Sequence, residues 1–129
     1  MLDTSVLIGM DTVDLGAYAN LSIIVSAITV GELAYALDPS AGVEAEARAQ
    51  RFREVLHSYE VIDFGVEAAK LYGAAATLVR AAGRNPRPRR VDLQIAATAA
   101  AARVPLLTCN PQDFVGVERL VDVVAIRRG

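Results

Sequence analysis

Short apolar runs alternate with helical patterns along the whole chain, and this alternation restricts the fold more than any other feature of the sequence. Strands separated by helix-length segments are typical of βαβ units, in which the strands lie parallel in one sheet. The sequence therefore predicts an α/β fold, a three-layer α/β/α sandwich around a sheet of about five mostly parallel strands. A chain of 129 residues without internal repeats or a linker suits one domain, covering residues 1–129.

Apolar runs predict a very short first strand that ends at Asp3, and further strands over 21–26, 60–63, 104–108 and 120–126. Periodic patterns predict helices over 4–10, 27–37, 42–56, 66–82 and 91–103, and residues 11–19 could form another short helix. The segment 83–90 (GRNPRPRR) contains two prolines among turn-forming residues, which predicts a loop without regular structure.

The overall charge balance gives no sign of a nucleic-acid partner, because 13 basic residues face 15 acidic ones. The basic residues are nevertheless unevenly placed. Four of them fall in the loop at 83–90, namely Arg84, Arg87, Arg89 and Arg90. An RNA backbone or an acidic protein segment would therefore have to be held by this local patch, which is otherwise a solvated linker.

Single Cys and His residues exclude several classes of site. Cys109 stands alone, so no disulfide can form within the chain, and His57 is the only histidine, which excludes a zinc site built from several His or Cys residues. The sequence shows neither a signal-peptide pattern nor a membrane-spanning apolar run, so we expect a cytoplasmic protein without a membrane partner.

Four carboxylates each lie just past an apolar run or in the opening turn of a helix: Asp3, Glu32, Asp92 and Asp113. In an open α/β sheet, such positions gather along one edge, where ligands bind. Four acids brought together would repel one another unless protons or cations offset their charge. The simplest occupant is a hard divalent cation, Mg²⁺ or Mn²⁺, which indicates metal-dependent phosphodiester chemistry.

Each carboxylate also has a purely structural interpretation. Asp3 could cap the helix that follows it, Asp92 could stabilise a helix start through the helix dipole, and Asp113 lies in an ordinary Asn-Pro turn. Glu32 follows the helix start expected at Ser26 and lies among apolar residues, so it needs a partner. The joint pattern is harder to explain structurally, since hydroxyl or amide residues able to support a metal site accompany the acids: Ser5, Thr29, Thr108 and Asn110.

Four segments occur in an order that resembles a known family: LDTSVLI at the start, SAITVGEL from Ser26, VDLQIAATA from Val91 and LLTCNPQDF from Leu106. The chain resembles the PIN domain, and most closely the VapC-type toxins of bacterial type II toxin–antitoxin pairs. By matching motifs, the acidic residues of the family correspond to Asp3, Glu32, Asp92 and Asp113, and the threonine and asparagine of its last motif to Thr108 and Asn110. The sequence departs from the family in having only two residues before Asp3.

The resemblance implies a Mg²⁺- or Mn²⁺-dependent endoribonuclease that forms a homodimer and is neutralised by a cognate VapB-type antitoxin. One alternative is a catalytically inactive PIN fold that binds RNA or protein. A phosphoaspartyl-type phosphotransfer domain fits less well, because Ser5 stands where a dehalogenase-like site needs a second Asp, and the only lysine, Lys70, lies in a predicted helix.

Overall fold

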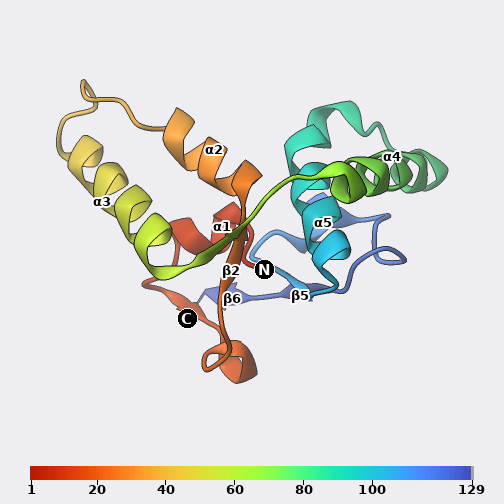
Figure 1. Cartoon of the computed structure of the whole chain (residues 1–129), viewed down its shortest axis with the longest axis horizontal. Coiled ribbons are helices and arrows are strands. Elements are labelled where there is room, and N and C mark those ends of the chain that lie inside the picture. Colours follow the sequence, from red (N-terminus) through yellow and green to blue (C-terminus); the bar gives the residue numbers. More distant parts are fainter. Residues whose placement is uncertain (129) are drawn as a thin grey trace.

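The computed structural model describes residues 1–128, and its elements follow the predicted alternation of strands and helices (Figure 1). The α-helices are α1 (Thr4–Ile8), α2 (Ala27–Tyr35), α3 (Val43–Ser58), α4 (Val66–Ala81) and α5 (Arg90–Ala102). The strands are β1 (Val13–Asp14), β2 (Ile24–Ser26), β3 (Glu60–Ile62), β4 (Leu106–Thr108), β5 (Val123–Ala125) and β6 (Arg127–Arg128). Three 3₁₀ turns are η1 (Gly16–Tyr18), η2 (Arg87–Arg89) and η3 (Pro111–Phe114).

The strands confirm the α/β class, with mostly parallel pairing. β2 pairs with β3 and β4 pairs with β5, both in parallel, while β1 and β6 form an antiparallel pair. The prediction of a single five-stranded sheet is not confirmed. The strands within residues 1–128 form three two-stranded sheets. The reason lies at the start of the chain, where Asp3 leads directly into α1 and only Leu2 forms an isolated bridge, with Leu107.

Residues 1–3 nevertheless connect two of the strand pairs. The Leu2 N–H donates to the Ile24 carbonyl at 3.0 Å, and the Asp3 N–H donates to the Leu107 carbonyl at 2.9 Å. The first residues therefore run between β2 and β4. This position brings Asp3 to the ends of both strands.

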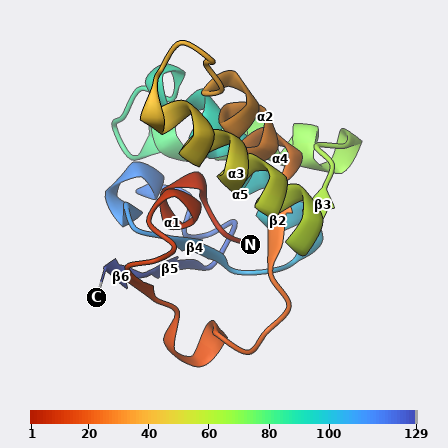
Figure 2. The same ribbon diagram turned by 90° about the vertical axis from the view of Figure 1, so that its left-hand side faces the viewer.

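The apolar core lies on both faces of the paired strands. Leu106 packs in a cluster with residues of α4 and α5, whereas its neighbour Leu107 packs in a second cluster with residues of α1, α2 and α3. Ile24 and Val25 of β2 divide between the two clusters in the same way. Since successive strand residues point to opposite faces, helices cover both sides of the strands, as predicted for three layers. Figures 1 and 2 show α2 beside α3 and α4 beside α5.

Two local predictions are wrong. Residues 11–19 do not form a helix but contain β1 and the 3₁₀ turn η1, because Val13 and Asp14 pair with Arg128 and Arg127 at the other end of the chain. The segment 83–90 does contain regular structure, since η2 covers Arg87–Arg89 and leads into α5. Here Pro88 lies in the first turn of η2, where its fixed φ and missing N–H suit a helical start.

Within residues 1–128, the structure has no helix of the length and apolarity that a membrane crossing requires.

Candidate active site

Asp3 is the most tightly held of the four acids. Its side chain is only 5% exposed and accepts hydrogen bonds from the Thr4 N–H at 2.8 Å, the Ser5 hydroxyl at 2.9 Å and the Thr108 hydroxyl at 2.8 Å. The Thr4 bond caps α1, so the structural interpretation of Asp3 is correct in part. The two hydroxyl bonds connect the start of the chain to the end of β4, and they fix the orientation of the carboxylate.

The hydroxyls that hold Asp3 are themselves oriented by backbone groups. The Ser5 oxygen accepts from the Cys109 N–H at 3.1 Å, and the Thr108 oxygen accepts from the Asn110 N–H at 3.0 Å. Because each oxygen accepts from a backbone amide, its proton is available to the Asp3 carboxylate. The Asn110 side chain forms no hydrogen bond with the acids within residues 1–128, and the backbone carbonyl of Asn110 accepts from the Asp113 N–H at 3.0 Å.

Glu32 is half-buried on α2 and receives one short hydrogen bond. The Thr4 hydroxyl donates to Glu32 Oε1 at 2.5 Å and lies 3.3 Å from the buried Thr29 hydroxyl. Burial raises the pKa of the Glu32 carboxyl, the Thr4 bond opposes this rise, and the negative charge of Asp3 adds to it. The helix begins as expected from Ser26, whose hydroxyl accepts from the Ile28 N–H at 3.0 Å.

Asp92 lies in the first turn of α5, with 28% of its side chain exposed. Its pKa is raised to about 6, chiefly by burial and then by the negative charges of Asp3, Asp113 and Glu32, while Arg89 lowers it. The other three acids therefore all lie close enough to Asp92 to act on its charge. This coupling is the clearest sign that the four carboxylates share one region.

Asp113 is held by a cation rather than by hydroxyl groups. Arg89 Nη1 lies 2.6 Å from Asp113 Oδ1 and 4.0 Å from Asp92 Oδ2, so one guanidinium lies between two of the acids. Asp113 stands in η3, but its side chain does not cap that turn. The Asp113 side chain instead forms an ion pair with Arg89, a residue 24 positions earlier in the chain.

The acids do not converge into a ready-made metal site. Across residues 1–128, no group of three or more His, Cys, Asp or Glu side chains is arranged so that it could hold a metal ion. The chemistry of the donors still suits a hard cation, because carboxylate and hydroxyl oxygens are the ligands that Mg²⁺ and Mn²⁺ prefer. A cation near Asp92 would also offset the repulsion that raises its pKa.

The four arginines of the 83–90 loop separate into two groups. Arg89 faces the acids, and Arg84 donates to the Gln112 carbonyl at 3.0 Å, close to Asp113 in the chain. Arg87 and Arg90 instead line a different pocket, beside α4. The loop is therefore not one uniform basic patch.

Sequence reasoning missed one residue that shapes the site, Thr4, which supplies the hydroxyl bond to Glu32 and whose only signal is its position directly after Asp3. For Arg89, contact with RNA or an antitoxin stays a prediction, and the structure adds an ion pair with Asp113. No local pattern distinguishes Arg89 from the arginines beside it.

Comparison with known proteins identifies the class to which this fold and site belong. A sequence profile of the family described as PIN domain matches residues 1–120. The chain therefore belongs to the PIN domain family, as its motifs predicted. No curated protein matches the sequence.

Solved structures with a similar fold come from toxin–antitoxin complexes. VapBC2 from Rickettsia felis, bound to a DNA fragment from its promoter, is 24% identical over 98% of both chains, with a TM-score of 0.74. VapBC-5 from Mycobacterium tuberculosis is 24% identical over 96% of this chain and 95% of that chain, with a TM-score of 0.73. A toxin–antitoxin complex from Klebsiella pneumoniae is 26% identical over 96% and 94% of the two chains, with a TM-score of 0.63.

Proposed function

We propose that this protein is a divalent-metal-dependent endoribonuclease and acts as the VapC-type toxin of a toxin–antitoxin pair. The single observation that carries the proposal is the environment of Asp92, whose charge is opposed by three other carboxylates in one partly buried region. Structural roles account for single acids but not for the mutual repulsion of four acids in one region. A bound cation that acts on a phosphodiester would offset that repulsion.

Asp3 and Asp92 are the main candidates to hold Mg²⁺ or Mn²⁺, with Glu32 and Asp113 completing the site through water. The bound ion would polarise the phosphodiester and lower the pKa of a water molecule that attacks it. Ser5 and Thr108 keep the Asp3 carboxylate in one orientation, and Thr4 and Thr29 do so for Glu32. Arg89 holds Asp113 beside Asp92 and limits the repulsion between them.

A cognate VapB-type antitoxin is the expected protein partner, because the solved structures of similar fold are complexes of toxin with antitoxin. One surface of this chain suits such a partner. A shallow apolar hollow beside Glu32 is lined by Ile28, Tyr35 and Val91, and Tyr35 is 95% exposed. An apolar antitoxin segment bound there would cover the approach to Glu32.

A homodimer and a cytoplasmic location complete the proposal. The Ala-rich helix α4 buries Ala68, Ala75 and Val79 against the core, and its remaining small residues permit a second copy to pack closely. An RNA substrate and a reducing environment both agree with a location inside the cell, where the lone Cys109 stays a thiol.

The test is cleavage of RNA by the purified protein with Mg²⁺, with Mn²⁺ and with a chelator. We expect cleavage only with metal, and a loss of about 100-fold or more in Asp3→Asn and in Asp92→Asn, because each change removes a ligand charge without altering size. Asp122→Asn is the matched control, since Asp122 is exposed and lies in a loop away from the four acids in sequence.

Two results would contradict the proposal. Unchanged cleavage in both variants would exclude the acids from the reaction. RNA or antitoxin binding without any metal-dependent cleavage would instead favour the catalytically inactive PIN fold, an alternative to which the lack of a ready-made metal arrangement within residues 1–128 lends some support.

A further inference from the structure

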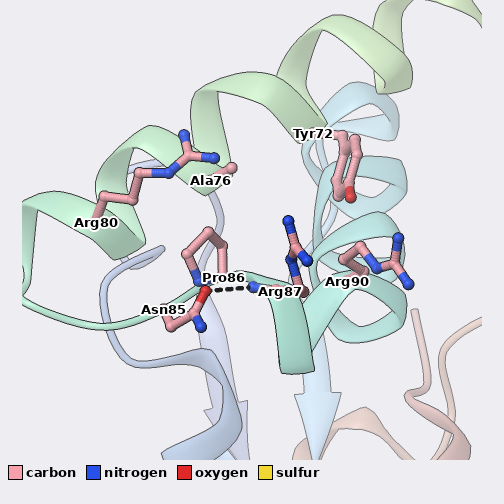
Figure 3. Close-up of a pocket in the computed structure, with 7 residues that line it drawn as sticks. All are labelled: Tyr72, Ala76, Arg80, Asn85, Pro86, Arg87 and Arg90. Atoms are coloured by element: carbon pink, nitrogen blue, oxygen red, sulfur yellow. Dashed lines mark hydrogen bonds between the residues drawn. The ribbon is translucent and has the colours of Figure 1, made fainter.

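A pocket of about 470 Å³ lies between α4 and the start of α5 (Figure 3), and none of the four acids lines it. Three arginines from two parts of the chain line it: Arg80 from α4, Arg87 from η2 and Arg90 from α5. Figure 3 shows the guanidinium groups of Arg80 and Arg87 on either side of the opening, with the Tyr72 hydroxyl directed down towards Arg87 and Arg90. Arg80 was not among the basic residues that the sequence singled out.

The positive charge of this pocket is not balanced by neighbouring acids. No Asp or Glu lines it, and within residues 1–128 the guanidinium groups of Arg80, Arg87 and Arg90 form no ion pair. Arg89, between two of them in the chain, is paired with Asp113. Three exposed guanidinium groups, without an ion pair in the described part of the chain, therefore surround one cavity and are available to an anionic ligand.

Uncharged groups of the pocket also suit an anion. The Asn85 Oδ1 accepts from the Arg87 N–H at 3.1 Å, which leaves the amide N–H groups of Asn85 to donate (Figure 3). The Tyr72 ring packs edge-on against Phe64, with ring centres 6.3 Å apart, and is thereby fixed in place. Donors surrounding a cavity of this size fit a phosphate group, which guanidinium groups bind in bidentate fashion.

The pocket is connected to the acids by the segment that links α4 to α5. Asn85 lines both this pocket and a neighbouring hollow of about 310 Å³ that is lined by Arg84, Arg89 and Asp113. On α5, Arg90 and Asp92 are two positions apart and so face opposite sides of the helix. A chain molecule that reaches the acids at one side can therefore pass Asn85 and reach Arg87 and Arg90 at the other.

We propose that the pocket of Arg80, Arg87 and Arg90 binds a backbone phosphate of the RNA substrate, at a nucleotide outside the cleaved bond. This inference rests on the proposed ribonuclease function and assigns the basic residues a specific task. An RNA strand is favoured over an acidic peptide, because Asn85 connects the pocket with the hollow of Arg89 and Asp113, and because Tyr72 offers an aromatic group on which a base can stack.

The test measures binding of a single-stranded RNA oligonucleotide to the full chain in a chelator, so that no cleavage occurs. The triple variant Arg80→Gln, Arg87→Gln, Arg90→Gln should bind at least about 10-fold more weakly near 0.1 M salt. The slope of log K against log salt should fall by about 0.7, the value for one phosphate contact on a single strand. The matched control is Arg53→Gln, which removes an exposed arginine of α3 that is paired with Glu46, and it should change affinity less than about 2-fold.

A second variant separates charge from geometry. Replacing the same three arginines with lysine keeps the charge but removes bidentate binding, so we expect an affinity between those of the wild type and the glutamine variant. Thermal melting of each variant verifies the fold, which exposed residues should leave intact. The glutamine variant binding RNA with wild-type affinity and salt slope would overturn the proposal.

The readout distinguishes this proposal from the proposed function. If the wild type cleaves RNA while the glutamine variant still binds it fully, only the pocket assignment fails. If the wild type binds RNA through the three arginines but never cleaves it, only the nuclease assignment fails. An acidic peptide of Asp and Glu that binds more tightly than RNA, and loses its affinity in the glutamine variant while RNA does not, would also overturn the pocket proposal.

Discussion

Asp3 and Asp92 have the same side chain, but the groups around the two carboxylates differ. Asp3, although 5% exposed, accepts three hydrogen bonds from groups whose protons point at it. Asp92 is more exposed, yet burial and three like charges raise its pKa to about 6. Neutral donors thus hold Asp3 in place, whereas burial and like charges oppose the charged form of Asp92, which Arg89 and the start of α5 favour.

The same contrast holds for the other two acids. Glu32, on the side of Asp3, accepts a hydrogen bond from the Thr4 hydroxyl, and Asp113, on the side of Asp92, forms an ion pair with Arg89. One side of the site is therefore held by neutral donors that remain in place whatever binds. The other side depends on positive charge, which we expect a metal ion to supply during the reaction. Asp3→Asn and Asp92→Asn should then have effects of opposite sign on stability.

The largest effect is expected for Asp92→Asn in the absence of metal. The folded-state pKa of about 6 lies above the reference value of 3.8, so the folded protein holds this proton more tightly than the unfolded chain. Stability from Asp92 is present in full below pH 4 and is lost as the pH rises through 6. The shift of about two units corresponds to at most about 3 kcal/mol. Above pH 6, Asp92→Asn should be about 1–3 kcal/mol more stable than the wild type. The gain is reduced because the variant loses the favourable interaction of the carboxylate with the helix dipole.

Urea unfolding in chelator, at intervals between pH 4 and 8, measures this difference. The advantage of Asp92→Asn should grow between pH 4 and 6 and level off above. Asp122→Asn, the exposed control, should show no such growth. A constant difference across this range would mean that Asp92 titrates normally and that the acids do not interact.

Asp3→Asn should destabilise the protein at the same neutral pH. An asparagine has one acceptor oxygen in place of two and adds two donors, so at least one of the Thr4, Ser5 and Thr108 donors loses its partner. A buried donor without an acceptor costs about 1–3 kcal/mol. If Asp3→Asn were as stabilising as Asp92→Asn in the same urea experiment, the hydroxyl groups would not distinguish the two sides of the site.

Arg89→Gln should have the smallest effect on stability, and bound metal should reduce that effect. The partly exposed ion pair with Asp113 is worth about 1 kcal/mol or less in the metal-free protein. With Mg²⁺ bound beside Asp92 and Asp113, the ion supplies the missing positive charge, and the deficit should shrink. Arg53→Gln breaks an ion pair far from the acids in the chain, and its deficit should be the same with and without Mg²⁺. A deficit in Arg89→Gln that Mg²⁺ leaves unchanged would separate Arg89 from the metal site.

Local signals predicted one part of this contrast and not the other. Short-range hydrogen bonding and the helix dipole predicted three positions: Asp3 before a helix, Asp92 in a first helical turn and Ser26 as a helix cap. The structure confirms all three. The partners of the acids come from distant parts of the chain. Thr4 reaches Glu32 across 28 positions and Thr108 reaches Asp3 across 105. Such pairs are set by tertiary packing, which no local pattern reports.

The fold shows the same division. Alternating apolar and helical segments predicted the order of elements, because each segment must bury its own apolar face. The pairing of Val13 and Asp14 with the last residues could not be predicted, because it joins two short segments at opposite ends of the chain. The short 3₁₀ turn at Arg87–Arg89 was hidden for another reason, since proline is compatible with both a loop and a helical start.

Binding of Mn²⁺, followed by its electron paramagnetic resonance signal at neutral pH, tests most directly whether the two sides form one metal site. The wild type should bind the ion, and Asp3→Asn and Asp92→Asn should each weaken binding by about 10-fold or more, because both carboxylates hold the same cation. Asp122→Asn should bind like the wild type. Wild-type Mn²⁺ affinity in both Asp3→Asn and Asp92→Asn would contradict the account.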